Sequence, residues 1–181
     1  MKAGGSAQQQ LGRSHSKQGD ALHKKVDVGI SDLKCSADPN AVIATYGLGS
    51  CIAVIAYDFL RSMGGILHYA LPNSSINEKK AKEQPAMFAD TGVPLLFQHM
   101  YALGSKKETL LIKVAGGGNL HNDFNVFQIG RRNYIVLRKL FSKNGILIAA
   151  EDVGDCKSRT VRLHVGTGKV TVSSQGTEVE L

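Results

Sequence analysis

A cysteine at a glycine-lined turn and a histidine on a nearby apolar run are the residues of this chain best suited to chemistry. Cys51 ends the segment YGLGSC (residues 46–51), and an apolar run follows it directly. His68 lies seventeen residues later, within a second apolar run. In cysteine chemistry the thiolate is the nucleophile, and a nearby imidazole is the usual means of forming it near neutral pH. The two residues therefore predict an enzyme, provided that their side chains meet in space.

The glycines in front of Cys51 suit the turn that such a nucleophile needs. Gly47 and Gly49 allow backbone conformations and close approaches that other residues avoid. A turn of this kind can point backbone N–H groups at the oxyanion that develops during attack on a carbonyl. We therefore expect Gly49 and Ser50 to form an oxyanion turn. Ser50 is expected to be a turn residue or an auxiliary donor and not the nucleophile, because a neutral serine needs a stronger base.

His68 is expected to act as a base and then as an acid, and it needs a group that orients its ring. It would take the thiol proton and later deliver that proton to the leaving group. Thr45 lies six residues before Cys51, at the end of the preceding predicted strand, and its hydroxyl is one candidate partner. The carboxylates of three aspartates are further candidates that the sequence does not separate: Asp90, Asp123 and Asp152.

The remaining cysteines and histidines carry weaker signals. The three cysteines of the chain, Cys35, Cys51 and Cys156, form neither an even set nor a short-spaced pair. This pattern disfavours a disulfide framework and a zinc site, and it is typical of a reducing compartment. His121 follows a triple glycine and could line a cleft, but it is a weaker candidate than His68.

Two glycine-rich stretches, 47–49 and 116–118, could suggest phosphate binding. The first lacks the Lys-Ser/Thr ending of a P-loop, and neither has the third glycine of a dinucleotide-binding turn at the required spacing. The sequence therefore predicts no organic cofactor and no metal.

Composition and charge limit the class of protein. The 181 residues are 43% hydrophobic and 20% charged, which is ordinary for one globular domain with a real core. Of the net charge of +7, +4 lies in residues 1–25, so the remainder is nearly neutral and a nucleic-acid partner is disfavoured. Residues 1–25 are polar and are expected to be a disordered tail, with a single domain over 26–181. The apolar runs are too short to span a bilayer and no signal peptide begins the chain, which favours the cytoplasm without membrane insertion.

Apolar periodicity predicts a mixture of strands and two helices. The predicted strands cover 26–33, 41–46, 51–57, 64–71, 110–115, 146–152, 160–165 and 169–173. One helix is expected from a cap at Asp90 to Leu103 and another over 129–143, with a polar mobile loop at 73–87 and a hairpin turn at Thr167-Gly168. Because the early strands follow one another directly, we expect a layered α+β domain with mixed sheets and not a doubly wound parallel sheet.

The motifs together resemble the chemoreceptor glutamine deamidases of the CheD family. The similarity lies in TYGLGSC (45–51) followed by HYALP (68–72), and it continues through FADT (88–91), KVAGGG (113–118), IGRRN (129–133), AEDVG (150–154), Arg159 and TGKV (167–170). These segments occur in the family's order over about residues 26–172.

The resemblance implies a three-layer α/β/β sandwich similar to that of toxin-type cysteine deamidases. It also implies hydrolysis of the side-chain amides of selected glutamines on methyl-accepting chemotaxis receptors, giving glutamate and ammonia. The family's catalytic cysteine, histidine and threonine fall on Cys51, His68 and Thr45 by motif. A CheC-type phosphatase is a further partner that the resemblance implies.

A second hypothesis from another class is a non-catalytic adaptor that docks receptors or a CheC-type phosphatase in the same cleft. Such an adaptor would need neither the cysteine nor the histidine, so Cys51 and His68 favour the enzyme. A nucleic-acid or nucleotide binder is the third hypothesis, and the charge distribution disfavours it.

Overall fold

The chain folds around two five-stranded mixed sheets. The computed structural model describes residues 24–119 and 128–181, together with Met1. The first sheet has the strand order β1-β3-β8-β9-β10, and the second has the order β2-β5-β4-β6-β7. The strands are β1 (Lys24–Val28), β2 (Asp32–Ser36), β3 (Ala41–Leu48), β4 (Ile52–Asp58), β5 (Met63–Tyr69), β6 (Leu110–Gly116), β7 (Ile148–Val153), β8 (Arg159–His164), β9 (Val170–Ser174) and β10 (Thr177–Glu180). The pairs β1/β3 and β6/β7 are parallel and the other pairs are antiparallel.

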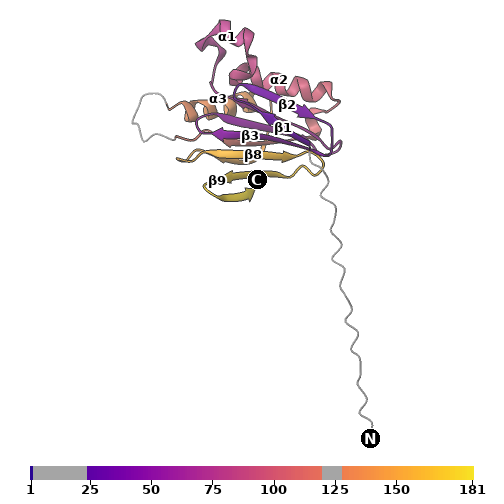
Figure 1. The fold of residues 1–181 in the computed structure, drawn as a ribbon. Coiled ribbons are helices and arrows are strands. Elements are labelled where there is room, and N and C mark those ends of the chain that lie inside the picture. Colours follow the sequence, from indigo (N-terminus) through magenta and orange to yellow (C-terminus); the bar gives the residue numbers. More distant parts are fainter. Residues whose placement is uncertain (2–23, 120–127) are drawn as a thin grey trace.

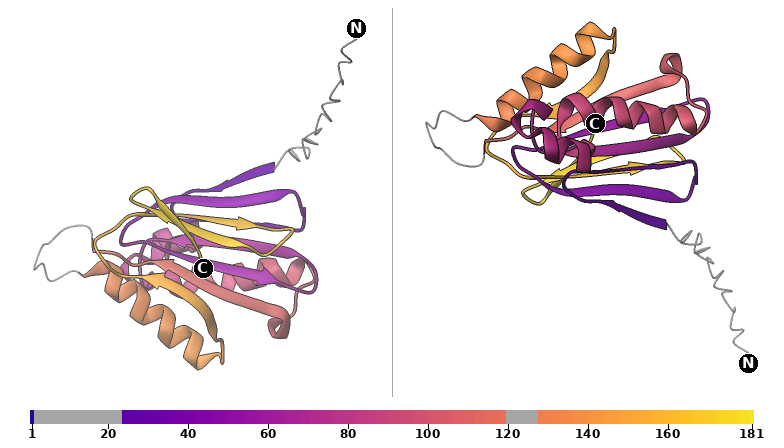
Figure 2. Two further views of the ribbon diagram at one scale, coloured as in Figure 1. Left: turned by 90° about the horizontal axis from the view of Figure 1, so that it is seen from below. Right: turned by 90° about the horizontal axis from the view of Figure 1, so that it is seen from above.

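The helices lie on one side of the second sheet, and the first sheet covers the other side (Figure 1). The helices are α1 (Glu78–Glu83), α2 (Ala89–Ala102) and α3 (Ile129–Lys143), with 3-10 turns η1 (Ser74–Ile76), η2 (Pro85–Met87) and η3 (Lys107–Thr109). Seen from above, α2 lies in front of the strands, and seen from below the strands lie in front of α2 (Figure 2). The expected α+β class with mixed sheets is confirmed, and the helices and sheets form three layers.

Strand β4 shows why the layers are arranged in this way. All of its residues are buried, so it appears in the sequence as a continuous apolar run. Val54 and Ala56 belong to the core between this sheet and the helices, whereas Ala53 and Ile55 belong to the core between the two sheets. Because successive side chains of a strand point to opposite faces, one strand contributes to both cores.

The predicted strand over 26–33 is wrong, because two strands of different sheets occupy this segment. β1 lies in the first sheet beside β3, and β2 lies in the second sheet beside β5. Ser31 between them has a φ of 60°, a left-handed conformation that ends an extended segment. β1 begins at Lys24, so the last two residues of the expected tail belong to the sheet, while residues 2–23 lie outside the described residues.

The helix predictions are confirmed at 129–143 and need a correction at the start of α2. The cap residue of α2 is Phe88, and Asp90 lies inside the helix. The Asp90 carboxylate accepts hydrogen bonds from the backbone and the hydroxyl of Ser74 instead. The segment expected as a loop at 73–87 contains α1 and two 3-10 turns, and β10 has no counterpart among the predicted strands. The hairpin at Thr167-Gly168 is confirmed, with Gly168 at a φ of 72°.

Candidate active site

Strand register places Cys51 and His68 on one face of the second sheet. Ala53 of β4 lies opposite His68 of β5 in an antiparallel pair. Cys51 lies two residues before Ala53 and packs against the core between the sheets. His68 alternates with Leu67 and Tyr69, which both belong to the core beneath the helices, so its ring faces the same inter-sheet space. Diagonal neighbours of this kind lie about 7–8 Å apart, within reach of long side chains.

Thr45 reaches His68 from the opposite sheet. Thr45 lies on β3, and its Oγ1 is 2.7 Å from Nδ1 of His68, with both residues fully buried. The same Oγ1 lies 2.9 Å from the carbonyl oxygen of Val28, its register partner on β1. The predicted contact between Thr45 and His68 is therefore present, and it joins the two sheets across the core.

These two hydrogen bonds define the tautomer of His68. A hydroxyl has one proton to donate, and a carbonyl oxygen can only accept. Thr45 therefore donates to Val28 and accepts from Nδ1–H of His68. The neutral ring then carries its proton on Nδ1 and its lone pair on Nε2. Nε2 is buried and has no hydrogen-bond partner among the described residues, which makes it an available proton acceptor.

Burial keeps both reactive groups uncharged at rest. Burial lowers the pKa of His68 from 6.5 to about 4, so the imidazole is neutral at neutral pH. Burial also raises the pKa of the Cys51 thiol, although a hydrogen bond from its own backbone N–H opposes this change. No hydrogen bond joins Cys51 to His68 in the described structure. The resting arrangement is thus a thiol and a neutral imidazole on one face, and not an ion pair.

The turn before Cys51 is held by its carbonyl groups. Gly118 N–H donates to the carbonyl of Gly49 at 2.8 Å, and Gly117 N–H donates to that of Cys51 at 2.8 Å. The carbonyl of Ser50 accepts from the side chain of Asn133 on α3 at 2.9 Å. Since the peptide bonds are trans, each held carbonyl turns the N–H of the following residue to the opposite side. Gly49 and Ser50 thus lie in the predicted turn beside the thiol.

The triple glycine at 116–118 has a structural explanation. Gly116 has a φ of 114°, and a Cβ atom there would collide with the carbonyl oxygen of Cys51. Gly117 and Gly118 supply the donors that hold the turn. The glycines therefore allow one backbone segment to lie directly against another.

The aspartates considered as partners of His68 have other contacts. Asp90 bonds to Ser74, and Asp152 forms ion pairs with Arg159 at 2.8 Å and with Lys157 at 3.1 Å. Neither carboxylate contacts His68, and Asp123 lies outside the described residues. Thr45 is the partner of Nδ1.

The other candidate residues lie away from the sheet face that holds Cys51 and His68, or they lie outside the described residues. Cys35 is on β2 opposite Gly65, and burial raises its pKa to about 12. Cys156 is exposed. His121 lies outside the described residues. Within 24–119 and 128–181, no group of three or more His, Cys, Asp or Glu side chains is placed to hold a metal ion.

Asn133 is a site residue to which the sequence alone assigned no role. It is fully buried on the inward face of α3, together with Gly130, Leu137 and Phe141. A carboxamide on an otherwise apolar helix face is the sequence signal that could have identified it. Its contacts with the turn before Cys51 place it in the site.

Comparisons with known proteins agree with the motifs. The family model for CheD chemotactic sensory transduction matches residues 70–174, more than half of the chain. A relative from Syntrophus aciditrophicus, named probable chemoreceptor glutamine deamidase CheD 1, is 51% identical over 83% of this chain and 94% of its own length. One from Anaeromyxobacter dehalogenans, named probable chemoreceptor glutamine deamidase CheD 2, is 48% identical over 82% of this chain and 94% of its own.

A third relative, from Solibacter usitatus, is named probable chemoreceptor glutamine deamidase CheD and is 43% identical over 87% of this chain and 94% of its own. Among the described residues, no helix has the length and apolar character needed to cross a membrane. The three matches extend over nearly the whole length of each relative. By these similarities, the chain belongs to the CheD family.

Proposed function

We propose that this protein hydrolyses the side-chain amides of glutamine residues on methyl-accepting chemotaxis receptors, giving glutamate and ammonia. The names of its relatives supply the substrate class. The observation that carries the chemistry is the buried pair Thr45–His68, which leaves Nε2 as an unpaired proton acceptor on the face that also holds Cys51. Cys51 is the proposed nucleophile and His68 the proposed base.

In the first half of the reaction, Sγ of Cys51 attacks the amide carbon as its proton moves to Nε2 of His68. The backbone N–H groups of the oxyanion turn (Gly49 and Ser50) and of Cys51, which follows the turn, stabilise the oxyanion of the tetrahedral intermediate. The C–N bond then breaks, Nε2 returns its proton to the departing nitrogen, and ammonia leaves a thioester on Cys51. Thr45 keeps the ring in the tautomer that this transfer needs.

In the second half, water attacks the thioester carbon while Nε2 takes one of its protons. The C–S bond breaks, the carboxyl group of glutamate is released, and the proton returns to Sγ. Neither half requires a cofactor or a metal. Because thiol and imidazole are both neutral at rest, the proton moves with the attack and not before it.

The organisation of the whole chain is part of the proposal. The three layers are joined by two hydrophobic cores, which supports a single domain over 26–181. A fold similar to that of toxin-type cysteine deamidases, which the sequence motifs imply, belongs to the same proposal. Residues 1–25 are the proposed tail, apart from the two residues in β1. The proposed place of action is the cytoplasm, where the receptor helices that carry the glutamines are accessible.

A CheC-type phosphatase is a proposed partner of the same surface. A pure adaptor for receptors or for this phosphatase is the competing function. It is less well supported, because docking alone does not need a histidine with one ring nitrogen held by Thr45 and the other left without a partner.

One experiment separates the enzyme from the adaptor. A receptor cytoplasmic fragment is incubated with the protein, and peptide mass spectrometry records the conversion of glutamine to glutamate. We expect conversion by the wild type and by Cys35→Ala, and none by Cys51→Ala or His68→Ala, with all four proteins binding the fragment. Full conversion by Cys51→Ala, or binding without conversion by the wild type, would contradict the proposal.

A further inference from the structure

Asn133 joins the two chain segments that carry the proposed nucleophile and base. Its Nδ2 lies 2.9 Å from the carbonyl oxygen of Ser50, just before Cys51, and 2.9 Å from that of Ala70, two residues after His68. Its own backbone oxygen accepts a hydrogen bond from the Tyr69 hydroxyl at 2.9 Å.

The side-chain amide of Asn133 can take only one orientation. Both neighbours of Nδ2 are carbonyl oxygens, which only accept, so the two N–H bonds must face them. The Oδ1 atom is then left buried with no partner among the described residues. A buried carboxamide with an unpaired oxygen costs free energy, so stability alone does not explain this residue.

The contact with Ser50 determines the direction of the next N–H group. Ser50 C=O and Cys51 N–H belong to one trans peptide and point in opposite directions. Asn133 holds the carbonyl toward α3, so the N–H of Cys51 points away from the helix layer. The Cys51 side chain packs on that same side, toward the inter-sheet core, and its own N–H lies against its sulfur.

The helix reaches the turn because Gly130 lies one helical turn before Asn133. A Cβ atom at Gly130 would lie 2.6 Å from the carbonyl oxygens of both Gly117 and Gly118. Only a glycine allows α3 to approach this loop closely enough for Asn133 to contact Ser50. The glycine loop at 116–118, which bonds to the carbonyls of Gly49 and Cys51, therefore also packs against the start of α3.

We propose that Asn133 is a positioning residue for the reaction. It holds the Ser50–Cys51 peptide so that the Cys51 N–H faces the oxyanion that forms on the carbon attacked by Sγ, and it fixes this peptide to the end of β5 beyond His68. This inference rests on the proposed function, because it assigns to Asn133 the geometry of one donor in the amide hydrolysis.

The test compares two reactions of the same thiol. Hydrolysis of a receptor glutamine passes through an oxyanion, whereas alkylation of Cys51 by iodoacetamide is a displacement at a saturated carbon and forms none. For Asn133→Ala we expect deamidation of a receptor cytoplasmic fragment to fall about 10²-fold, the cost of a lost oxyanion donor. The alkylation rate of Cys51 should stay close to that of the wild type.

Two further variants keep the test decisive. Leu137→Ala, on the same face of α3 but with an apolar side chain that makes no hydrogen bond to the turn, should lower the melting temperature and leave deamidation by the folded protein intact. Asn133→Ser is smaller but keeps a donor, and it serves if Asn133→Ala does not fold; we expect reduced deamidation with normal alkylation.

Deamidation at the wild-type rate in both Asn133 variants would overturn the inference and leave the proposed function standing. An equal loss of alkylation and deamidation would also overturn it, since the whole site would then be disturbed. A wild type that leaves the receptor fragment unchanged would overturn the proposed function and this inference with it.

Discussion

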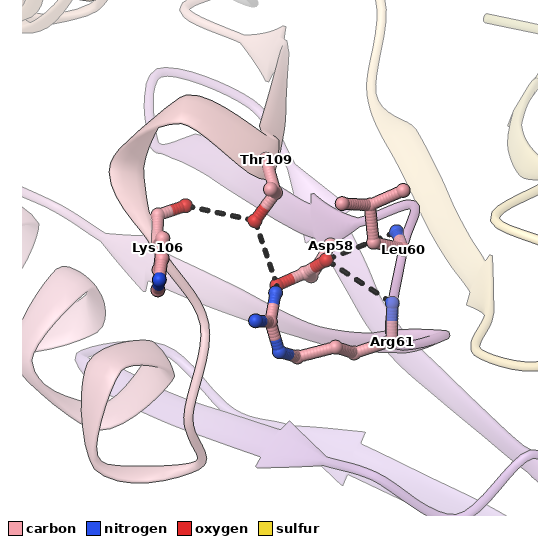
Figure 3. Close-up of polar contacts among 5 residues, drawn as sticks. All are labelled: Asp58, Leu60, Arg61, Lys106 and Thr109. Carbon is pink, nitrogen blue, oxygen red and sulfur yellow. Dashed lines mark hydrogen bonds and ion pairs between the residues drawn. The ribbon is translucent and has the colours of Figure 1, made fainter.

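A buried polar cluster lies beside each end of β4, and the two clusters differ in whether every hydrogen-bond acceptor has a donor. At the end with Asp58, the carboxylate accepts from the backbone N–H groups of Leu60 and Arg61 and from the side chains of Arg61 and Thr109 (Figure 3). At the other end, the Nδ1–H of His68 donates a hydrogen bond to the hydroxyl of Thr45, and Nε2 has no partner among the described residues. Both oxygens of the Asp58 carboxylate accept hydrogen bonds, and such a cluster stabilises a hairpin. The unpaired Nε2 of His68 costs stability but remains able to accept a proton.

The same difference appears in the charges. Burial tends to raise the pKa of Asp58, but the hydrogen bonds that it accepts outweigh burial and lower the pKa below 3.8. For His68 burial acts alone and lowers the pKa to about 4. One group is therefore held in its charged form and the other in its neutral form, both at neutral pH.

The largest expected effect in this comparison is the pH dependence that His68 gives to stability. Between pH 6.5 and about 4 the unfolded chain binds a proton at this residue and the folded chain does not. The contribution of His68 to the free energy of unfolding is therefore fully present above pH 6.5. It is lost as the pH falls to about 4, and the total loss is about 3 kcal/mol. Urea unfolding of the wild type and of His68→Gln, at several pH values, measures this difference. Identical pH profiles for the two proteins would contradict the neutral, buried imidazole.

The second expected effect is on the rate. Thr45→Val keeps the shape of the side chain but removes the oxygen that accepts from Nδ1–H, so the ring is free to take the other tautomer. We expect deamidation to fall about 5–150-fold, corresponding to the 1–3 kcal/mol cost of an unsatisfied buried donor. Thr45→Ser retains the oxygen and should restore most of the rate. Equal rates in the Val and Ser variants would show that the hydroxyl does not position His68.

The smallest expected effect on the reaction comes from the satisfied cluster. Asp58→Asn keeps one acceptor oxygen for the backbone but loses the charge-assisted bonds to Arg61 and Thr109. We expect the free energy of unfolding to fall by about 2 kcal/mol at pH 7, with deamidation by the folded protein unchanged. Urea unfolding and a receptor-fragment assay on the same preparation check both parts. A large loss of rate without a loss of stability would place Asp58 in the site and remove the contrast between the two ends.

Much of the site was accessible from the sequence because its parts are local. The turn before Cys51 and the apolar runs around it and around His68 follow from glycine spacing and periodicity, and Thr45 lies at the end of the preceding run. The tautomer of His68 was not accessible, since it depends on the carbonyl of Val28 on a strand that neighbours Thr45 only in the folded sheet.

The remaining errors also come from non-local contacts. Residues 26–33 alternate like one strand, yet Ser31 turns the chain and each half pairs with a different sheet. Asn133 lies 83 residues from Ser50 in the chain, so only the packing of α3 against the glycine loop brings the two together. Local periodicity predicts the elements, whereas the partner of each polar group is decided by the assembled layers.

The most direct test is to trap the covalent intermediate on Cys51. The wild type is mixed with a receptor-helix peptide that contains a target glutamine, quenched with acid within the first turnover, digested, and analysed by mass spectrometry. We predict a thioester on Cys51 with the mass of the peptide less ammonia, which hydroxylamine releases and which Cys51→Ala does not form. An adduct on a different residue, or conversion of the glutamine by Cys51→Ala at the wild-type rate, would contradict the assignment of Cys51 as the nucleophile.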